Sequence, residues 1–201
     1  MALGIPKKRV KPAEKVNKEE KEQFIQKKVY NLANAIKIPA PINQFKTQLE
    51  GVDLERTISL LKKYTPETKL ERYERLKSEN PKAGPKPMLL KFGLRHIVDL
   101  IEQKKLGFLA IAADVAPITL VISLPTLCKK MNIPYCIVPS KQALGALVHL
   151  KSSAVVGIEQ VRPEDSAEFS DIIRISNALF LSQYEKHMTT IGGRIAKKAE
   201  L

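Results

Sequence analysis

The chain has 201 residues, 44% of them hydrophobic, and a formal net charge of +13 with a pI near 9.7. This apolar fraction is sufficient for a buried core and excludes a wholly disordered chain. A positive charge of this size favours a polyanionic partner, with nucleic acid ahead of an anionic membrane surface.

The excess of positive charge lies mostly in the N-terminal part of the chain. Residues 1–87 hold 20 Lys and Arg against 11 Asp and Glu, residues 88–160 hold 8 against 4, and residues 161–201 hold 6 of each. Residues 1–18 alternate Lys, Pro and Val without a helical period, which predicts a basic extended arm that becomes ordered on a polyanion. The first 28 residues contain no continuous apolar stretch, so no secretory signal is expected.

Residues 19–87 are predicted to form a helical extension and a linker. Apolar residues recur at helical spacing over residues 19–36, and two prolines end that helix. Asp53 is expected to cap a second helix, and Thr65 with Pro66 to begin a third. The last eight residues of the segment hold three prolines and a glycine, which indicates the linker.

The composition after residue 87 is that of a compact α/β domain, residues 88–161. Short apolar runs of strand length alternate with helical patterns, which favours a three-layer α/β/α sandwich around a small mixed sheet, preceded by the helical extension and the basic arm. Residues 162–201 are predicted to add a C-terminal helix and a short tail. The predicted strands cover residues 107–113, 133–138 and 154–161, and the predicted helices cover residues 94–103, 117–130, 141–148 and 163–186.

Potential catalytic and metal-binding residues form no recognisable constellation. The three histidines have neither metal-ligand nor catalytic-triad spacing, and no Gly-rich phosphate loop occurs. Cys128 and Cys136 have no Cys or His at ligand spacing, so core thiols in a reducing compartment are favoured over metal ligands. The most apolar segment, residues 106–125, is interrupted by Asp114 and Pro117, which does not suit a membrane span. We therefore expect no catalytic residue, metal, cofactor, membrane contact or small-molecule substrate.

A run in the centre of the domain resembles the signature of the kink-turn-binding ribosomal proteins. Two flanking segments, residues 41–45 and 63–69, resemble the eukaryotic large-subunit branch of that family and are missing from its small stand-alone members. The resemblance covers residues 38–160. The signature run is Cys128-x4-Ile133-Pro134-Tyr135-x2-Val138-x-Ser140-Lys141-x2-Leu144-Gly145.

This resemblance implies a structural, non-enzymatic constituent of the large ribosomal subunit that binds and stabilises folded rRNA. The implied partners are large-subunit rRNA and neighbouring large-subunit proteins, with assembly in the nucleus and nucleolus and function on cytoplasmic ribosomes. An alternative is a snoRNP-type kink-turn-binding protein of an RNA-modification guide complex, against which the N-terminal extension argues. An RNA-modifying transferase is a third hypothesis, but no second domain long enough for a cofactor fold is present.

The resemblance places one part of the RNA contact at Lys91, Gly93, Arg95 and His96. Gly93 precedes a predicted helix, whose N–H groups and positive dipole end suit a phosphate or a base edge. The same pattern also fits a plain strand-to-helix turn. The family usually has Asn at the position of Arg95, where it contacts a guanine edge, and Arg can contact either a guanine edge or a phosphate.

The second part of the implied contact is the loop containing Val148, His149, Leu150 and Lys151. Its apolar tip is expected to pack under an extruded base while the cation holds a phosphate, although His149 also fits a plain surface position. Lys141 follows an expected N-cap serine and either reaches a phosphate or is only a solvated first-turn residue. Each charge cluster in the arm and extension fits either phosphate contacts or a solvated face. The RNA contacts expected there are Lys7, Lys8, Arg9, Lys27, Lys28, Gln44, Lys62, Lys63 and Lys69.

Overall fold

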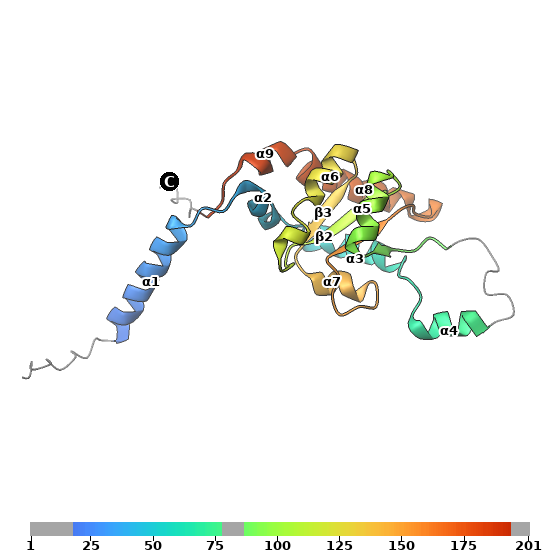
Figure 1. Cartoon of the computed structure of the whole chain (residues 1–201), viewed down its shortest axis with the longest axis horizontal. Helices are drawn as coiled ribbons and strands as arrows, with labels where there is room; N and C mark the ends of the chain where they lie inside the picture. The colour runs from blue at the N-terminus through green and yellow to red at the C-terminus, as the bar shows by residue number, and fades with distance from the viewer. Residues whose placement is uncertain (1–17, 78–86, 194–201) are drawn as a thin grey trace, which may run out of the picture. The chain divides into compact units, whose positions relative to one another are not determined.

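The computed structural model of the chain describes residues 18–77 and 87–193 (Figure 1). Most of the predicted basic arm, with Lys7, Lys8 and Arg9, lies outside the described residues. The predicted linker, except for its last residue, and the end of the predicted C-terminal tail also lie outside them.

The chain divides into two compact units, residues 1–37 with 193–201 and residues 38–192. The described part of the first unit contains helix α1, Lys18–Ala35, which confirms the helix predicted from the apolar spacing. The large apolar side chains of α1 are half or more exposed. This helix therefore has an apolar face without a partner among the described residues of its own unit.

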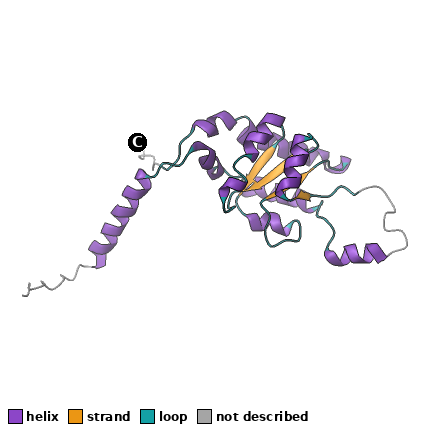
Figure 2. Ribbon diagram, in the orientation of Figure 1, coloured by secondary structure: helices purple, strands orange, loops and turns teal. Residues whose placement is uncertain are grey.

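Four short strands form a mixed sheet in the second unit, drawn in orange in Figure 2. Their order is β1-β4-β2-β3, with β2 and β3 parallel and β4 antiparallel to both of its neighbours. Every residue of β2, β3 and β4 is buried, as their continuous apolar runs predict. The two-residue strand β1 is too short for a sequence pattern to predict it. The strands are β1 Lys91–Phe92, β2 Phe108–Ala112, β3 Tyr135–Val138 and β4 Val155–Ile158.

Helices form most of the rest of the second unit. The helix predicted over residues 117–130 is instead a 3-10 turn, Ile118–Leu120, followed by a separate helix. The break arises because Pro117 has an extended conformation, with ψ 146°, and the helix begins again next to Pro125. The helices are α2 Ala40–Asn43, α3 Gly51–Lys62, α4 Lys69–Lys77, α5 Leu94–Glu102, α6 Leu124–Met131, α7 Lys141–Ala146, α8 Ser166–Ser176 and α9 Tyr184–Thr189.

Two predicted helix starts in the extension are wrong. Helix α4 begins after Thr68 and not at Thr65, because Thr68 and Glu71 form a reciprocal capping box. The Thr68 N–H donates to the Glu71 carboxylate at 2.8 Å, and the Glu71 N–H donates to the Thr68 hydroxyl at 3.3 Å. Asp53 lies inside the first turn of α3, where its charge suits the helix dipole, and Glu50 occupies the N-cap position.

The C-terminal helix predicted over residues 163–186 is divided into shorter pieces. Between α8 and α9 the chain widens into a π-helical turn, Asn177–Leu181, in which the Ser182 N–H donates to the carbonyl five residues before it. This turn carries the buried ring of Phe180, whose centroid lies 5.8 Å from that of Tyr135 on β3. The widened turn therefore allows the helix to pack an aromatic ring against the edge strand.

The two faces of the sheet are covered by different helices. A Cβ placed on Gly157 of β4 would lie 3.0 Å from the Ile97 side chain, so this face of β4 lies against α5. Phe108 faces the opposite side, because it is one position away from the partner of Gly157 on β2. The Phe108 ring meets the ring of Phe169 on α8 edge-on, with centroids 6.2 Å apart. The predicted three-layer α/β/α arrangement is thus confirmed.

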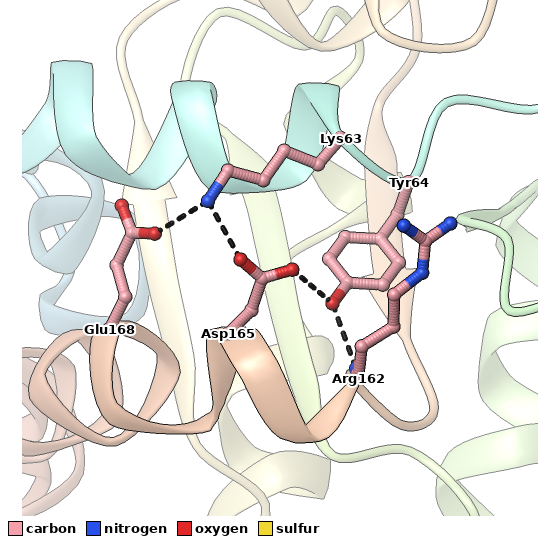
Figure 3. A network of polar contacts seen from close by, with 5 residues as sticks. All are labelled: Lys63, Tyr64, Arg162, Asp165 and Glu168. Carbon is pink, nitrogen blue, oxygen red and sulfur yellow. Dashed lines mark hydrogen bonds and ion pairs between the residues drawn. The ribbon is translucent and has the colours of Figure 1, made fainter.

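A polar network joins the end of α3 to the chain just before and within α8 (Figure 3). Tyr64 is 1% exposed, and its hydroxyl donates to the Asp165 carboxylate at 2.7 Å and accepts from the Arg162 N–H at 2.8 Å. The Lys63 ammonium pairs with Asp165 at 2.7 Å and with Glu168 at 2.9 Å. The described extension after residue 37 therefore belongs to the same compact unit as the α/β domain.

The charges in this network reinforce one another. Hydrogen bonds from Lys63 and then Tyr64 lower the pKa of Asp165, and hydrogen bonds to Asp165 and Glu168 raise the pKa of Lys63. Burial, followed by the bond to Asp165, raises the pKa of Tyr64. Near neutral pH, Tyr64 is therefore a neutral donor facing an ionised acceptor.

Replacing Tyr64 by Phe should lower the free energy of unfolding by about 2 kcal/mol, because it leaves two polar groups without their buried partner. Urea unfolding would measure the change. Tyr184→Phe is the matched control, since it removes the same atom from an exposed bond to Thr126 and should cost about 0.5 kcal/mol or less. Equal losses in the two variants would show that the network does not join the segments as described.

Candidate nucleic-acid interface

The strand order brings four separate segments to one end of the sheet. The parallel strands β2 and β3 both end there, and the antiparallel strand β4 begins there. Strand β1 runs antiparallel to β4, with Phe92 paired to Val156, so β1 also ends there. Consequently the turn at Gly93, the residues after β2 and β3, and the loop before β4 share this end of the sheet.

The turn between β1 and α5 depends on glycine. Gly93 has φ 94° and ψ 123°, a conformation that a side chain strongly disfavours, although a Cβ there would meet no atom within 4 Å. Helix α5 starts immediately afterwards, so its first-turn N–H groups and positive dipole end face outward beside the turn. Arg95 and His96 are exposed in that first turn, while Ile97 is fully buried and anchors the helix.

Lys91 is not brought together with this turn. Its ammonium lies 3.9 Å from the carboxylate of Glu159, which follows the far end of β4. The side chain of Lys91 therefore extends toward the opposite end of the sheet. This position argues against the predicted RNA contact, because the ion pair directs the cation away from Gly93.

The loop after α7 folds tightly over Gly145. The N–H groups of Val148 and Leu150 both donate to the Gly145 carbonyl, at 3.0 and 2.9 Å. A Cβ on Gly145 would lie 2.6 Å from the Cα of Ser152, so only glycine allows this close approach. The loop is thus held in one shape by its own backbone.

The loop presents three of its four predicted contact residues to solvent. Val148 is only 4% exposed and packs in the core, so the exposed apolar tip is Leu150, and a contact of Val148 with RNA stays a prediction. Lys151 is exposed. His149 is exposed as well, but its Nε2 lies 2.9 Å from the Pro66 carbonyl oxygen and donates to it. His149 therefore also ties the loop to the segment before α4.

Lys141 is held beside the end of β2. Ser140 caps α7 as predicted, since its hydroxyl accepts from the N–H groups of Gln142 and Ala143. The Asp114 carboxylate accepts from the Lys141 N–H at 2.6 Å, and the Lys141 ammonium lies 3.4 Å from the Asp114 carbonyl oxygen. Asp114 is therefore a helix-capping residue, and Lys141 stays at the end of the sheet that carries the Gly93 turn.

The contacts predicted in the extension fall into two groups. Gln44 is 3% exposed and donates to the Pro41 carbonyl at 2.7 Å, so its side chain has a structural role, and its contact with RNA stays a prediction. The Lys63 ammonium is already bound by two carboxylates in the Tyr64 network. The remaining described members of the set are exposed; these are Lys27, Lys28, Lys62 and Lys69.

The cysteines are buried and unreactive. Burial raises the pKa of Cys128 and of Cys136 to about 12, so both remain protonated thiols near neutral pH. Within residues 18–77 and 87–193, no three His, Cys, Asp or Glu side chains gather in a way that could hold a metal ion. The same described ranges contain no helix with the length and apolarity needed to cross a membrane.

One exposed aromatic residue beside the turn is missing from the predicted set. Phe92 is 40% exposed and directly precedes Gly93. Its signal in the sequence is weak, because a two-residue strand shows no alternation. Together with Arg95, Leu150 and Lys151, it supplies the cations and apolar surface that structured RNA requires.

These features define an α/β/α protein of the type that contacts structured RNA. The model of the ribosomal protein L7Ae/L30e/S12e/Gadd45 family matches residues 75–170. Large ribosomal subunit protein eL8 of Encephalitozoon cuniculi (strain GB-M1) is 46% identical over 203 residues, covering 100% of this chain and 98% of that protein. The chain belongs to the L7Ae/L30e/S12e/Gadd45 family.

Fungal relatives show the same similarity over shorter ranges. Large ribosomal subunit protein eL8B of Candida albicans is 42% identical over 193 residues, which cover 87% of this chain and 73% of that protein. Large ribosomal subunit protein eL8 of Schizosaccharomyces pombe is 40% identical over 178 residues, covering 84% of this chain and 68% of that protein. In each case the alignment extends well beyond the α/β domain.

Substituting Gly93 by Ala should weaken binding to a short kink-turn RNA by about tenfold, because a Cβ forces the turn out of its observed conformation. Fluorescence anisotropy with labelled RNA would measure the affinity. Gly51→Ala is the control, since Gly51 also has a positive φ of 61° and a Cβ placed there would likewise meet no atom within 4 Å. If Gly51→Ala weakens binding as much as Gly93→Ala, the turn does not form part of the interface.

Proposed function

We propose that this chain is a structural constituent of the large ribosomal subunit that binds and stabilises folded rRNA. The similarity to a large-subunit protein over 98% of that relative's length carries the proposal. Because the similarity includes the extension as well as the α/β domain, a large-subunit protein is favoured over a small stand-alone kink-turn binder. The proposed role is structural and non-enzymatic, which the similarity to ribosomal proteins supports.

The proposed RNA contact combines a fixed turn with exposed cations. The first-turn N–H groups of α5 would bind a phosphate or a base edge next to Gly93, with Arg95 and His96 reaching the RNA from the same turn. Leu150 would support an unstacked base, and Lys151 would hold the adjacent phosphate. The rigid loop over Gly145 favours this arrangement because it places the apolar tip before RNA arrives.

Arg95 gives this interface a different chemistry from that of the usual family member. Asn presents one amide to a base edge, whereas the Arg guanidinium is always charged and offers a planar fork of donors. Such a fork suits the O6 and N7 acceptors of guanine or two phosphate oxygens. We therefore propose that Arg95 strengthens the phosphate component of binding at this position.

The proposed partners are large-subunit rRNA and neighbouring large-subunit proteins. Assembly is proposed to take place in the nucleus and nucleolus, and function on cytoplasmic ribosomes. The exposed cations Lys62 and Lys69, at the end of α3 and the start of α4, are proposed to contact further rRNA phosphates.

Arg95→Ala and Lys151→Ala should each weaken binding to a kink-turn RNA, and each should reduce the slope of log affinity against log salt by about 1. Both side chains are exposed, so the thermal midpoint should stay nearly constant. The matched control is Lys105→Ala, an exposed lysine between α5 and the start of β2, at the opposite end of the sheet. An unchanged slope in both test variants, or an equal change in the control, would contradict the proposed contact.

A further inference from the structure

Helix α4 begins beside the loop after α7, which carries part of the proposed RNA contact. The Nε2 of His149 in that loop lies 2.9 Å from the Pro66 carbonyl oxygen, so the loop contacts the segment that leads into α4. Arg75 of α4 binds Glu67 of the same segment, with nitrogen–oxygen distances of 2.7 and 2.9 Å. The surface of α4 is therefore a neighbour of the exposed loop tip at Leu150.

One face of α4 carries large apolar side chains that the rest of the described chain leaves uncovered. Leu70, Tyr73 and Leu76 are 75%, 58% and 56% exposed, and α4 contains no buried residue. Successive members of this set are three residues apart, so the three side chains share one side of the helix. This side does not stabilise the described fold by packing, and it is open to a partner.

The neighbours of Tyr73 on the helix surface are two cations and two leucines. Residues three or four positions away lie beside a given residue on a helix, and for Tyr73 these are Lys69, Leu70, Leu76 and Lys77. Lys69 and Lys77 are exposed, and neither forms an ion pair with a described carboxylate. We call these five residues the Tyr73 face.

The two carboxylates of α4 do not neutralise the lysines of the Tyr73 face. Glu71 accepts from the Thr68 N–H at 2.8 Å in the capping box at the start of the helix. Glu74 is three residues from Lys77, but the Lys77 ammonium lies instead over the Tyr73 ring, 4.4 Å from its centroid. The cation covers one face of a ring that remains largely exposed, so the other face is available to a planar group.

We propose that the Tyr73 face binds an unpaired nucleotide of the same RNA that contacts the loop after α7, with the base stacked on the Tyr73 ring. Leu70 and Leu76 border the base, and Lys69 and Lys77 hold the phosphates on either side of it. The ligand is single-stranded RNA, because a paired base has both of its faces covered inside the helical stack. The inference rests on the proposed function, since that function brings RNA to the neighbouring loop.

The charges favour RNA over an apolar protein surface as the partner of the Tyr73 face. An apolar surface packed on Leu70 and Leu76 would desolvate the ammonium groups of Lys69 and Lys77 without supplying an anion to either, which is unfavourable. A single RNA strand supplies a phosphate to each ammonium group and a flat base to the ring. The position of α4 next to the loop after α7 favours RNA for the same reason.

Titrating the ¹⁵N-labelled full chain with hexauridylate tests this proposal. The amides of α4 should shift, with a dissociation constant on the order of 1 mM for so short a strand. An abasic hexanucleotide carries the same phosphates without bases and should act on these amides about tenfold more weakly. Equal affinity of the two probes would overturn the stacking role. If only the capped peptide acetyl-Leu-Ala-Leu-amide shifts the α4 amides, the partner is a protein and the assignment of RNA is wrong.

Variants of Tyr73 separate stacking from folding. Tyr73→Ala should weaken hexauridylate at α4 about tenfold, whereas Tyr73→Phe should bind as the wild type does because the ring is kept. Tyr184→Ala, at a partly exposed tyrosine of α9, is the matched control and should leave the α4 shifts unchanged. A Phe variant as weak as the Ala variant, or a lower thermal midpoint in Tyr73→Ala, would overturn the role given to the ring.

The two lysines of the Tyr73 face are tested through the dependence of hexauridylate binding on salt. The pair Lys69→Gln/Lys77→Gln should reduce the slope of log affinity against log salt by about 1.4, since each phosphate contact with a single strand contributes about 0.7. The charge-matched pair Lys104→Gln/Lys105→Gln removes two exposed lysines between α5 and β2. An equal change in both pairs would contradict the phosphate contacts at α4.

Binding of a short kink-turn RNA without unpaired overhangs distinguishes this inference from the proposed function. Tyr73→Ala should leave that affinity nearly unchanged, and a loss there would contradict a separate site on α4. A wild-type chain that binds the kink-turn RNA but shows no α4 shifts with hexauridylate would overturn this inference alone. Failure to bind the kink-turn RNA, with the α4 shifts retained, would instead count against the proposed function.

Discussion

The position of β4 between β1 and β2 is the constraint on which the interface depends. Because β4 pairs antiparallel with both neighbours, the loop before it lies at the end where β1 and β2 finish. Gly157 fixes the register of β4, because it faces the side chains of Ile97 and Leu106. A Cβ added to Gly157 would lie within 3.0 Å of both side chains. A slip of one residue would turn a Val or Ile toward that crowded side. The packing of one glycine thus aligns segments that are more than 50 residues apart in the chain.

The Tyr64 network, formed by Lys63, Tyr64, Arg162, Asp165 and Glu168, fixes the position of the extension against the α/β domain. It binds the end of α3 to the chain around α8 through a buried hydroxyl and two ion pairs. The Tyr64 carbonyl also accepts from the Leu90 N–H at 2.9 Å, so the same residue holds the chain leading into β1. The described extension is consequently part of the folded unit and supports the position of β1, from which the Gly93 turn follows. Its exposed cations are then available to RNA while its buried residues serve the fold.

The sequence predicts the layers of the fold well because hydrophobic period and strand burial are local signals. The runs that form β2, β3 and β4 and the amphipathic residues of α1 and α5 show those periods clearly. Strand β1 was not predicted because a strand of two residues shows no hydrophobic alternation. The C-terminal helix was predicted as one piece because its π-helical turn depends on packing against Tyr135, which the local sequence does not show. Such tertiary effects override the local pattern.

The interface was predictable only in part, for a similar reason. Exposed side chains are found at Arg95, His96 and Lys151. The burial of the Val148 and Gln44 side chains depends on contacts with distant segments. The direction in which the Lys91 side chain extends depends on its ion pair with Glu159. Residue type and resemblance identify the segment that carries a site. They do not specify which of its side chains turn into the core, which is decided by sheet register and loop geometry.

The most direct test of the proposed function is sedimentation of a tagged full chain in a sucrose gradient. EDTA would first separate the ribosomal subunits, and a high-salt wash would remove loosely bound protein, since electrostatic contacts alone weaken steeply with salt. The account predicts that the protein remains in the large-subunit peak. Migration with small RNA–protein particles, or as free protein at the top of the gradient, would contradict it.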